Sequence, residues 1–179
     1  RLSNVFDNKE ETRTHTRKYL GVAFVQNEFN YFIPFSSPKD SDYVHRSDGI
    51  KVIRKSIIPI IRMVTSDSLS GEVELKGTLK LSNMIPVPEQ ELTPYIISEE
   101  TDSNYKIVVQ KEYDFIKANE KLIMKNANVL YNQKIKADIF YIDKPAPKYL
   151  LSTVDFLYAE YKCKCYTEEI LCINDNGLQ

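Results

Sequence analysis

The feature that most constrains the fold is the way extended and helical patterns are divided along the chain. Up to residue 87 the apolar residues come in short runs, such as Phe29–Phe35 and Ile57–Val64, which turn-forming residues separate. From Tyr105 to Tyr131 apolar residues instead recur at three- and four-residue steps, the spacing of one buried helix face. Strands first and helices later, joined by connections of hairpin length, predict an α+β fold with a mainly antiparallel sheet.

The first two strands form a predicted hairpin. Lys18–Gln26 carries apolar residues on both faces, as a strand in the middle of a sheet does. Asn27 and Glu28 then turn the chain into the strand Phe29–Phe35. The later strands are predicted at Ile50–Lys55, Ile57–Val64, Glu72–Leu81 and Met84–Val87.

Two helices are predicted after the strands. Asp102 or Ser103 caps the first, because either side chain can accept hydrogen bonds from the free N–H groups of the first turn. The second begins near Pro147, a residue favoured in a first helical turn. Its predicted buried face is made of Leu150, Val154, Leu157 and Tyr161. Three aromatic residues on apolar periodic faces are predicted to lie in the core, namely Tyr31, Tyr113 and Phe156.

Length and composition indicate a single domain. The chain has 179 residues, of which 42% are hydrophobic, so it can build one proper core. Residues 1–16 are polar and have no period, so they are expected to form a loop, and residues 163–179 are expected to form a tail. No run of about 18 apolar residues is present, so no membrane span is predicted.

The three cysteines, Cys163, Cys165 and Cys172, are expected to be free thiols. An odd number of cysteines without a secretory signal is typical of a reducing compartment, here the cytoplasm. A closed zinc site needs about four ligands. No fourth ligand lies near the cysteines in the sequence, and His15 and His45 are far upstream. We therefore predict no metal and no other cofactor.

The formal net charge is −1, which argues against a surface coated with phosphate-binding residues. The charges are nevertheless segregated, since residues 1–80 carry 13 Lys and Arg against 10 Asp and Glu, and residues 106–164 carry 11 against seven. Segregated charge can form a basic groove on a nearly neutral protein. One stripe of the predicted first helix, Lys117, Lys121 and Lys125, is either a solvated face or an RNA-binding surface.

The stretch most informative about function is Tyr31–Lys39, in which an apolar strand ends in two serines, a proline and a lysine. Pro38 fixes its own φ and biases Ser37 toward an extended conformation, so the hydroxyls of Ser36 and Ser37 are presented stiffly at the rim of a sheet. Lys39 adds a mobile cation. Hydroxyl and ammonium groups at a rigid strand end suit the binding of a phosphodiester, although Ser-Pro and Pro-Lys also occur in ordinary turns.

Three further stretches agree with Tyr31–Lys39 in order and spacing, and they are Leu79–Pro88, Phe115–Asn119 and Asp155–Phe156. Together the four resemble the ToxN/AbiQ family, the endoribonuclease toxins of type III toxin–antitoxin systems. The resemblance covers about residues 17–161. Members of that family carry a further short strand and helix upstream, so we expect this chain to begin inside the natural protein.

The resemblance implies a strongly twisted, mainly antiparallel sheet packed with helices, similar to the toxins Kid and MazF. It implies a metal-independent endoribonuclease that leaves a 2′,3′-cyclic phosphate and a 5′-hydroxyl. The implied partners are cellular or phage RNA substrates and a cognate RNA antitoxin made of structured repeats. The toxin processes this antitoxin, which inhibits it in a closed protein–RNA assembly. The implied biology is abortive infection of phage-infected cells.

The resemblance also implies a set of site residues. The family has an active-site lysine four residues before a strand glycine, and counting back from Gly21 places Arg17 there. Arginine grips phosphate with two donors, but it stays protonated and is a poor general acid or base. A tyrosine further upstream contributes in some relatives, and the matching position here is near Arg13, so that role is absent or supplied elsewhere. The predicted catalytic residues are thus Ser37, Lys39, Ser36 and Arg17, and the predicted RNA-binding residues are Arg13, Lys18, Lys117, Lys121 and Lys125.

Two alternatives to an enzyme remain open. Arg17 and the missing tyrosine are also compatible with a catalytically inactive RNA-binding module on the same scaffold. A weaker alternative is an interaction domain that binds no nucleic acid. His15 and His45 lie in polar loops about thirty residues apart, and no Asp-x-Asp or similar carboxylate cluster for Mg²⁺ occurs outside plain loops. The general base and the general acid are therefore left unassigned.

Overall fold

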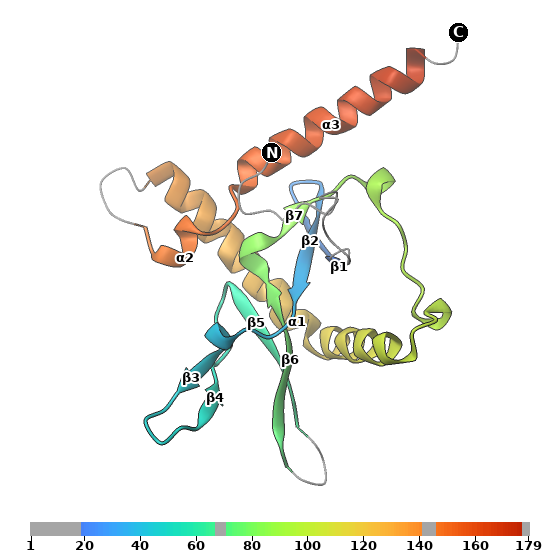
Figure 1. Ribbon diagram of the computed structural model, residues 1–179. Helices are drawn as coiled ribbons and strands as arrows, with labels where there is room; N and C mark the ends of the chain where they lie inside the picture. Colours follow the sequence, from blue (N-terminus) through green and yellow to red (C-terminus); the bar gives the residue numbers. More distant parts are fainter. Residues whose placement is uncertain (1–18, 67–70, 141–145, 177–179) are drawn as a thin grey trace.

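The computed structural model describes the backbone of residues 19–66, 71–140 and 146–176, and the side chains of residues 25–66, 71–139 and 146–169 (Figure 1). Within these ranges strands occupy the first half of the chain and helices the second. Every strand pair is antiparallel. The predicted α+β class and the predicted antiparallel sheet are therefore confirmed.

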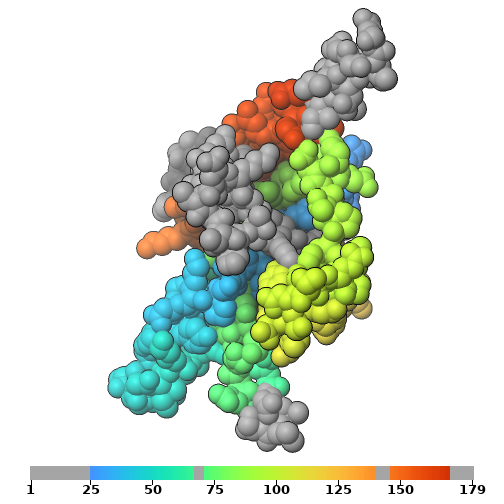
Figure 2. Space-filling model, turned by 45° about the vertical axis from the view of Figure 1, so that its right-hand side comes forward, coloured from blue at the N-terminus to red at the C-terminus, as the bar shows by residue number. Residues whose placement is uncertain are grey.

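The main sheet has the order β1 (Tyr19–Gln26), β2 (Phe29–Ser36), β6 (Val73–Lys80), β5 (Ile60–Ser66), and β7 (Ile85–Pro86) also pairs with β2. β2 is central because it pairs with β1 on one edge and with β7 and the end of β6 on the other. A second sheet contains β3 (Tyr43–His45) and β4 (Lys51–Ile53), which project from the body as a hairpin (Figures 1 and 2).

The predicted hairpin between β1 and β2 is present. Its turn residues, Asn27 and Glu28, have φ angles of 49° and 70°. These left-handed values are the ones that a tight two-residue turn requires. The turn is tied to the helical layer, because the amide of Asn27 donates a hydrogen bond to the hydroxyl of Tyr131 at 2.8 Å.

Helix α1 spans Ser103–Phe140 and continues beyond the predicted end at Tyr131. Asp102 caps it as predicted, because its carboxylate accepts hydrogen bonds from the N–H groups of Asn104 and Tyr105 at 2.9 and 3.1 Å. The buried side chains of α1 include Ile116, Ile123, Ala127 and Leu130, which keep the predicted period. The core position predicted for Tyr113 is wrong: it lies at the edge of this stripe and is 43% exposed.

The second predicted helix is in fact two helices, α2 (Lys148–Leu151) and α3 (Phe156–Asn176). The hydroxyls of Ser152 and Thr153 both donate to the carbonyl of Tyr149, at 3.1 and 2.7 Å, and this local bonding competes with a continued helix. Asp155 then caps a new start by accepting the N–H of Tyr158 at 2.9 Å. Residues 163–176, expected as a tail, belong to α3.

The new start of α3 changes which side chains face the core. Leu150 and Val154 are buried as predicted, but Leu157 and Tyr161 are 44% and 59% exposed, so that part of the prediction is wrong. The buried side chains of α3 are instead those of Phe156, Ala159 and Glu160. None of the described helices is long and apolar enough to cross a membrane.

The core centres on three aromatic rings from three elements. Tyr31 of β2 meets Tyr131 of α1 edge-on with ring centroids 5.9 Å apart, and Phe156 of α3 edge-on at 5.8 Å. Tyr131 and Phe156 stack at 5.4 Å. Such pairs add stability beyond the area they bury. The predicted core positions of Tyr31 and Phe156 are confirmed, since neither is exposed to solvent.

A buried carboxylate joins the same three elements. The Oε1 atom of Glu160 accepts hydrogen bonds from the hydroxyls of Tyr31 and Tyr131 at 2.7 and 2.8 Å. Burial, followed by the hydrogen bond to this carboxylate, raises the pKa of both tyrosines far above the ordinary value. Both hydroxyls therefore remain proton donors, and Glu160 links β2, α1 and α3.

We expect Glu160→Leu to lower the free energy of unfolding by about 2–4 kcal/mol, because it removes the acceptor of two buried hydroxyls. Glu160→Gln keeps a carbonyl acceptor at the same place, and its loss should be about 1 kcal/mol or less. Urea unfolding followed by circular dichroism measures both changes.

The same experiment has a control in pH. The pKa of both tyrosines is higher in the folded state than in the unfolded state. Their contribution to the free energy of unfolding is therefore fully present below about pH 10, the ordinary tyrosine pKa, and is lost as the pH rises further. A loss of less than about 1 kcal/mol for Glu160→Leu would show that the carboxylate is not the link.

Candidate active site

The two predicted serines lie at the end of β2 in different environments. Ser36 is the last residue of the strand, pairs with Thr78 of β6 and is only 7% exposed. The hydroxyl of Thr78 donates to the carbonyl of Ser36 at 3.4 Å, and the hydroxyl of Ser36 donates to the carbonyl of Ser37 at 3.4 Å. Ser36 therefore holds the strand end in place, whereas Ser37 is exposed.

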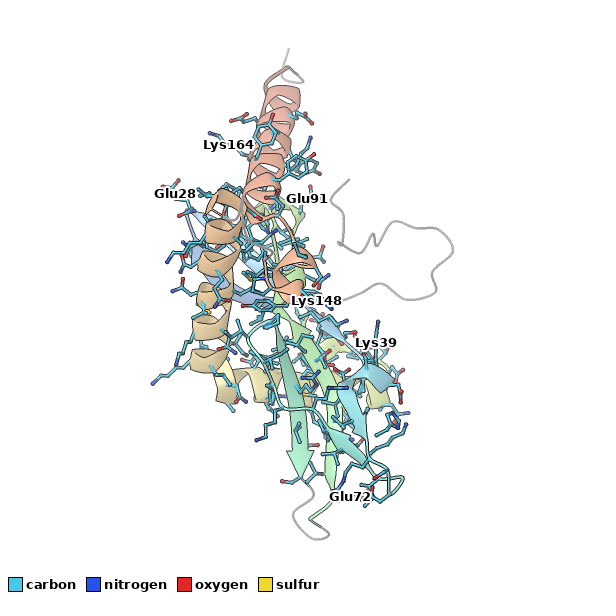
Figure 3. All side chains as sticks on the ribbon, turned by 90° about the vertical axis from the view of Figure 1, so that its left-hand side faces the viewer. Glu28, Lys39, Glu72, Glu91, Lys148 and Lys164 are labelled. Carbon is cyan, nitrogen blue, oxygen red and sulfur yellow. The ribbon has the colours of Figure 1, made fainter. Side chains whose placement is uncertain are left out.

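Ser37, Pro38 and Lys39 follow β2 as an exposed segment (Figure 3). Pro38 has no N–H group and so cannot continue the strand ladder. The chain next enters a short 3₁₀ helix, η1 (Asp40–Asp42), which leads directly into β3. A hydroxyl and an ammonium group thus face solvent at the place where the central strand ends.

The backbone of this exposed segment is fixed from below by Asp42. The N–H of Lys39 donates to Oδ2 of Asp42 at 3.0 Å, and the N–H of Asp42 donates to the carbonyl of Lys39 at 2.9 Å. The carbonyl of Asp42 also accepts the N–H of Arg54 at 2.8 Å. One buried residue therefore determines where the Lys39 backbone lies relative to the β3–β4 hairpin.

Asp42 is in turn paired with Arg62 of β5, and both residues are 6% exposed. The guanidinium donates to Oδ1 of Asp42 through Nε at 3.1 Å and approaches it through Nη2 at 3.0 Å. Its Nη1 donates to the carbonyl of Lys55 at 2.7 Å. A buried ion pair of this kind is tolerated because hydrogen bonds satisfy its remaining donors. It connects the Lys39 segment to the main sheet.

A second, exposed cluster lies next to Lys39. The carboxylate of Asp40 is 3.0 and 3.1 Å from Nε2 of His45, and it accepts a hydrogen bond from Nζ of Lys51 at 3.1 Å. The hydrogen bond from Lys51, and then that with His45, lowers the pKa of Asp40. His45 is exposed, and Asp40 holds the side chains of His45 and Lys51 near the loop after Lys39.

The remaining predicted residues are distributed over other parts of the chain. Arg13, Arg17 and Lys18 lie outside the described residues. The stripe of Lys117, Lys121 and Lys125 is exposed on α1, and Nζ of Lys117 lies 5.6 Å from the ring centroid of Tyr113. Their roles in RNA binding stay predictions. Among residues 25–66, 71–139 and 146–169, no group of three or more histidine, cysteine or acidic side chains could hold a metal ion.

Asp42 and Arg62 were missed by the sequence analysis. Asp42 sits in a polar loop sequence, where charge is ordinarily solvated. Arg62 did carry a signal, because it interrupts the apolar run Ile60–Val64, and a charge in a buried strand requires a partner. The sequence does not identify that partner, which is 20 positions away.

We expect Arg62→Met to lower the free energy of unfolding by about 3–5 kcal/mol, because it leaves the buried carboxylate of Asp42 without its counter-charge. The double variant Asp42→Asn, Arg62→Met should be less destabilised than Arg62→Met alone. It buries no charge, and the amide oxygen that replaces the carboxylate can still accept the N–H of Lys39. Chemical denaturation of the parent and both variants, together with Asp42→Asn alone, measures this coupling. A double variant that loses the sum of the single effects would contradict the pairing.

Comparisons with known proteins agree with the architecture. The sequence model of the family described as toxin ToxN, type III toxin–antitoxin system, matches residues 2–164. The endoribonuclease ToxN of Bacillus thuringiensis subsp. kurstaki is 29% identical over 171 residues, which cover 93% of this chain and 76% of that protein. The endoribonuclease AbiQ of Lactococcus lactis subsp. lactis is 27% identical over 151 residues, which cover 84% and 74%.

Two solved structures share the fold. One, from work on selective toxin inhibition by a non-coding RNA pseudoknot in type III toxin–antitoxin systems, is 29% identical with a TM-score of 0.67, covering 93% of this chain and 88% of that one. The other, AbiQ, a lactococcal anti-phage endoribonuclease, is 26% identical with a TM-score of 0.66 and the same coverage. The family expected from the four sequence stretches is thereby confirmed, and the chain belongs to the ToxN family of type III toxin–antitoxin toxins.

Proposed function

We propose that the chain is a metal-independent endoribonuclease toxin that a cognate RNA antitoxin, made of structured repeats, inhibits and that the toxin also processes. Membership of the ToxN family supports this, as do the endoribonuclease activities in the names of its relatives. The observation that carries the proposal is the exposed Ser37–Lys39 segment, which Asp42 anchors by its backbone at the end of the central strand. The toxin would act in the bacterial cytoplasm on cellular or phage RNA.

The proposed reaction needs no external co-reactant. The ribose 2′-oxygen attacks the adjacent phosphorus, the bond from phosphorus to the 5′-oxygen breaks, and a 2′,3′-cyclic phosphate and a 5′-hydroxyl result. The 2′-oxygen must lose a proton and the 5′-oxygen must gain one. The negative charge that develops on the phosphorane must meanwhile be stabilised by donors already in position.

We assign roles from the position of these residues at the strand end. The hydroxyl of Ser37 hydrogen-bonds the scissile phosphate or the 2′-hydroxyl, and Lys39 stabilises the negative charge of the phosphorane. Ser36, buried and paired with β6, supports the segment from within. Arg17 is assigned a phosphate contact, which its permanent charge and two donors suit. The Lys117, Lys121 and Lys125 stripe is assigned contacts to the RNA backbone.

We propose that the antitoxin RNA and the toxin form a closed assembly, as the family suggests, and that release of the toxin aborts phage infection. The relative from the pseudoknot study supports an RNA inhibitor of this kind. The rival function, an inactive RNA-binding module, shares the scaffold and differs only in chemistry, so cleavage assays distinguish the two.

Ser37→Ala should abolish RNA cleavage and toxicity while leaving the free energy of unfolding unchanged, because an exposed hydroxyl contributes little to the core.

Lys39→Ala should slow cleavage of bound RNA about a hundredfold or more, the usual effect of losing a preorganised donor. Single-turnover cleavage with RNA binding measured in parallel tests both, and Ser41→Ala on the adjacent 3₁₀ helix is the matched control. A folded Ser37→Ala protein that cleaves normally removes the site assignment; a parent that binds RNA but never cuts it supports the inactive module.

Cleavage should persist in excess EDTA, because the charge stabilisation proposed here comes from Lys39 and Arg17. The products should carry a 2′,3′-cyclic phosphate and a 5′-hydroxyl, which mass spectrometry of the cut RNA identifies. Loss of activity on chelation, restored by Mg²⁺, would place the enzyme in a different class of nuclease.

A further inference from the structure

The outward face of α3 combines aromatic and cationic side chains that the active site does not use. Five described tyrosines are well exposed, and three of them, Tyr158, Tyr161 and Tyr166, lie within nine positions of this one helix. Leu157 is exposed beside them. Because Phe156, Ala159 and Glu160 face the core, Tyr158 and Tyr161 lie on the solvent side of the helix. Such a concentration is unusual for an otherwise polar surface.

Two of these tyrosine rings share one ammonium group. The Nζ atom of Lys162 lies 5.6 Å from the ring centroid of Tyr158 and 5.9 Å from that of Tyr161. Contact with a cation at this range is attractive and limits the conformations of all three side chains. Tyr158 and Tyr161 nevertheless stay 43% and 59% exposed.

The exposed charged side chains of α3 up to Thr167 are both positive, and the exposed acids Glu168 and Glu169 follow on the next turn. Between Phe156 and Thr167 the exposed charged residues are Lys162 and Lys164, and the one acid, Glu160, is buried against Tyr31 and Tyr131. Figure 3 shows Lys164 on the part of α3 that extends beyond the sheet. Tyr166 differs from the other two tyrosines, because its hydroxyl donates to Glu91 at 2.8 Å.

This composition favours one class of partner over the other. Protein–protein interfaces are enriched in tyrosine but depleted in lysine at their centre, and here Lys162 occupies the centre. Surfaces that bind single-stranded nucleic acid combine aromatic rings, on which unpaired bases stack, with cations that contact the phosphates. Bases in a duplex are already stacked on one another and cannot use such rings.

We propose that the face formed by Tyr158, Tyr161, Lys162 and Lys164 binds unpaired nucleotides of RNA, with the tyrosine rings stacking on bases and the lysines contacting phosphates. This rests on the proposed function only in taking RNA as the partner. The surface is separate from the strand end that carries Ser37, so it contributes to retention of RNA and not to the cleavage step.

The test is binding of a short, unstructured, fluorescein-labelled RNA with 2′-O-methyl riboses, which cannot be cut by 2′-oxygen attack, followed by fluorescence anisotropy. Tyr158→Leu, Tyr161→Leu should weaken binding about tenfold or more, since each stacked base contributes measurably. Tyr158→Phe, Tyr161→Phe keeps both rings and should bind within about twofold of the parent. Lys162→Gln should lower the salt dependence of log Kd by about 0.7, the loss of one phosphate contact on a single strand.

Two controls decide the outcome. Tyr95→Leu removes an exposed tyrosine elsewhere and should leave binding unchanged, and the same RNA annealed to its complement should bind parent and leucine variant equally. The inference is overturned if the leucine variant binds the single strand like the parent, if the phenylalanine variant loses as much as the leucine variant, or if the patch instead drives dimerisation in sedimentation. Cleavage of unmodified RNA by the parent protein is measured alongside. If the parent does not cleave, the proposed nuclease function is wrong, and the binding results for the α3 face still stand on their own.

Discussion

Glu160 places a carboxylate where β2, α1 and α3 meet, and the packing of all three depends on how its charge is satisfied. A buried carboxylate is costly unless donors surround it. Here the hydroxyls of Tyr31 and Tyr131 supply two of them, and their rings pack against Phe156. Burial keeps both tyrosines protonated, so the donors persist well above the ordinary tyrosine pKa. The helices are therefore fixed in position on the central strand by polar bonds as well as apolar contacts.

The central strand β2 also fixes the position of the candidate site. Tyr31 lies on β2, and β2 ends at Ser36, one residue before the exposed hydroxyl of Ser37. Beyond the strand the constraint passes to Asp42, which holds the Lys39 backbone, and through Arg62 back to β5. Glu160 holds Tyr31 and Asp42 holds Lys39, so two buried charged residues limit the motion of the segment from Tyr31 to Lys39. For catalysis by positioned donors, a displacement of about 1 Å already costs much of the rate, so this rigidity matters.

The sequence predicted most of the fold because its signals were local. Alternation, turn residues and the capping Asp102 gave the strands, the first hairpin and the start of α1. The prediction failed where the decisive interaction was not periodic: the hydroxyls of Ser152 and Thr153 split the second helix, and the restart at Asp155 turned Tyr161 outward.

For the candidate site the sequence identified the exposed segment but not its support. Ser37 and Lys39 were recognisable from a contiguous motif, whereas the link from Asp42 to Arg62 joins residues 20 positions apart in different elements. Both hydroxyls, of Ser36 and Ser37, were expected at the rim of the sheet, and only the structure shows that Ser36 pairs with Thr78 and is buried while Ser37 is exposed. Ion pairs across a sheet leave no spacing rule in the sequence, and so they become visible only in three dimensions.

With a net charge of −1, the electrostatic attraction of RNA depends on local basic surfaces and not on the charge of the protein as a whole. Asp40 of η1 pairs with Lys51 of the β3–β4 hairpin, and Asp48 lies 3.5 Å from Arg46, so the positive charge of the hairpin is partly neutralised. The stripe on α1 and the aromatic face of α3 belong to other elements of the chain than that hairpin. An RNA that reaches two such surfaces at once binds the second at a high effective concentration, whereas a short strand reaches only one. On the function proposed here, this difference separates a structured inhibitor, which stays bound, from a substrate, which leaves after cleavage.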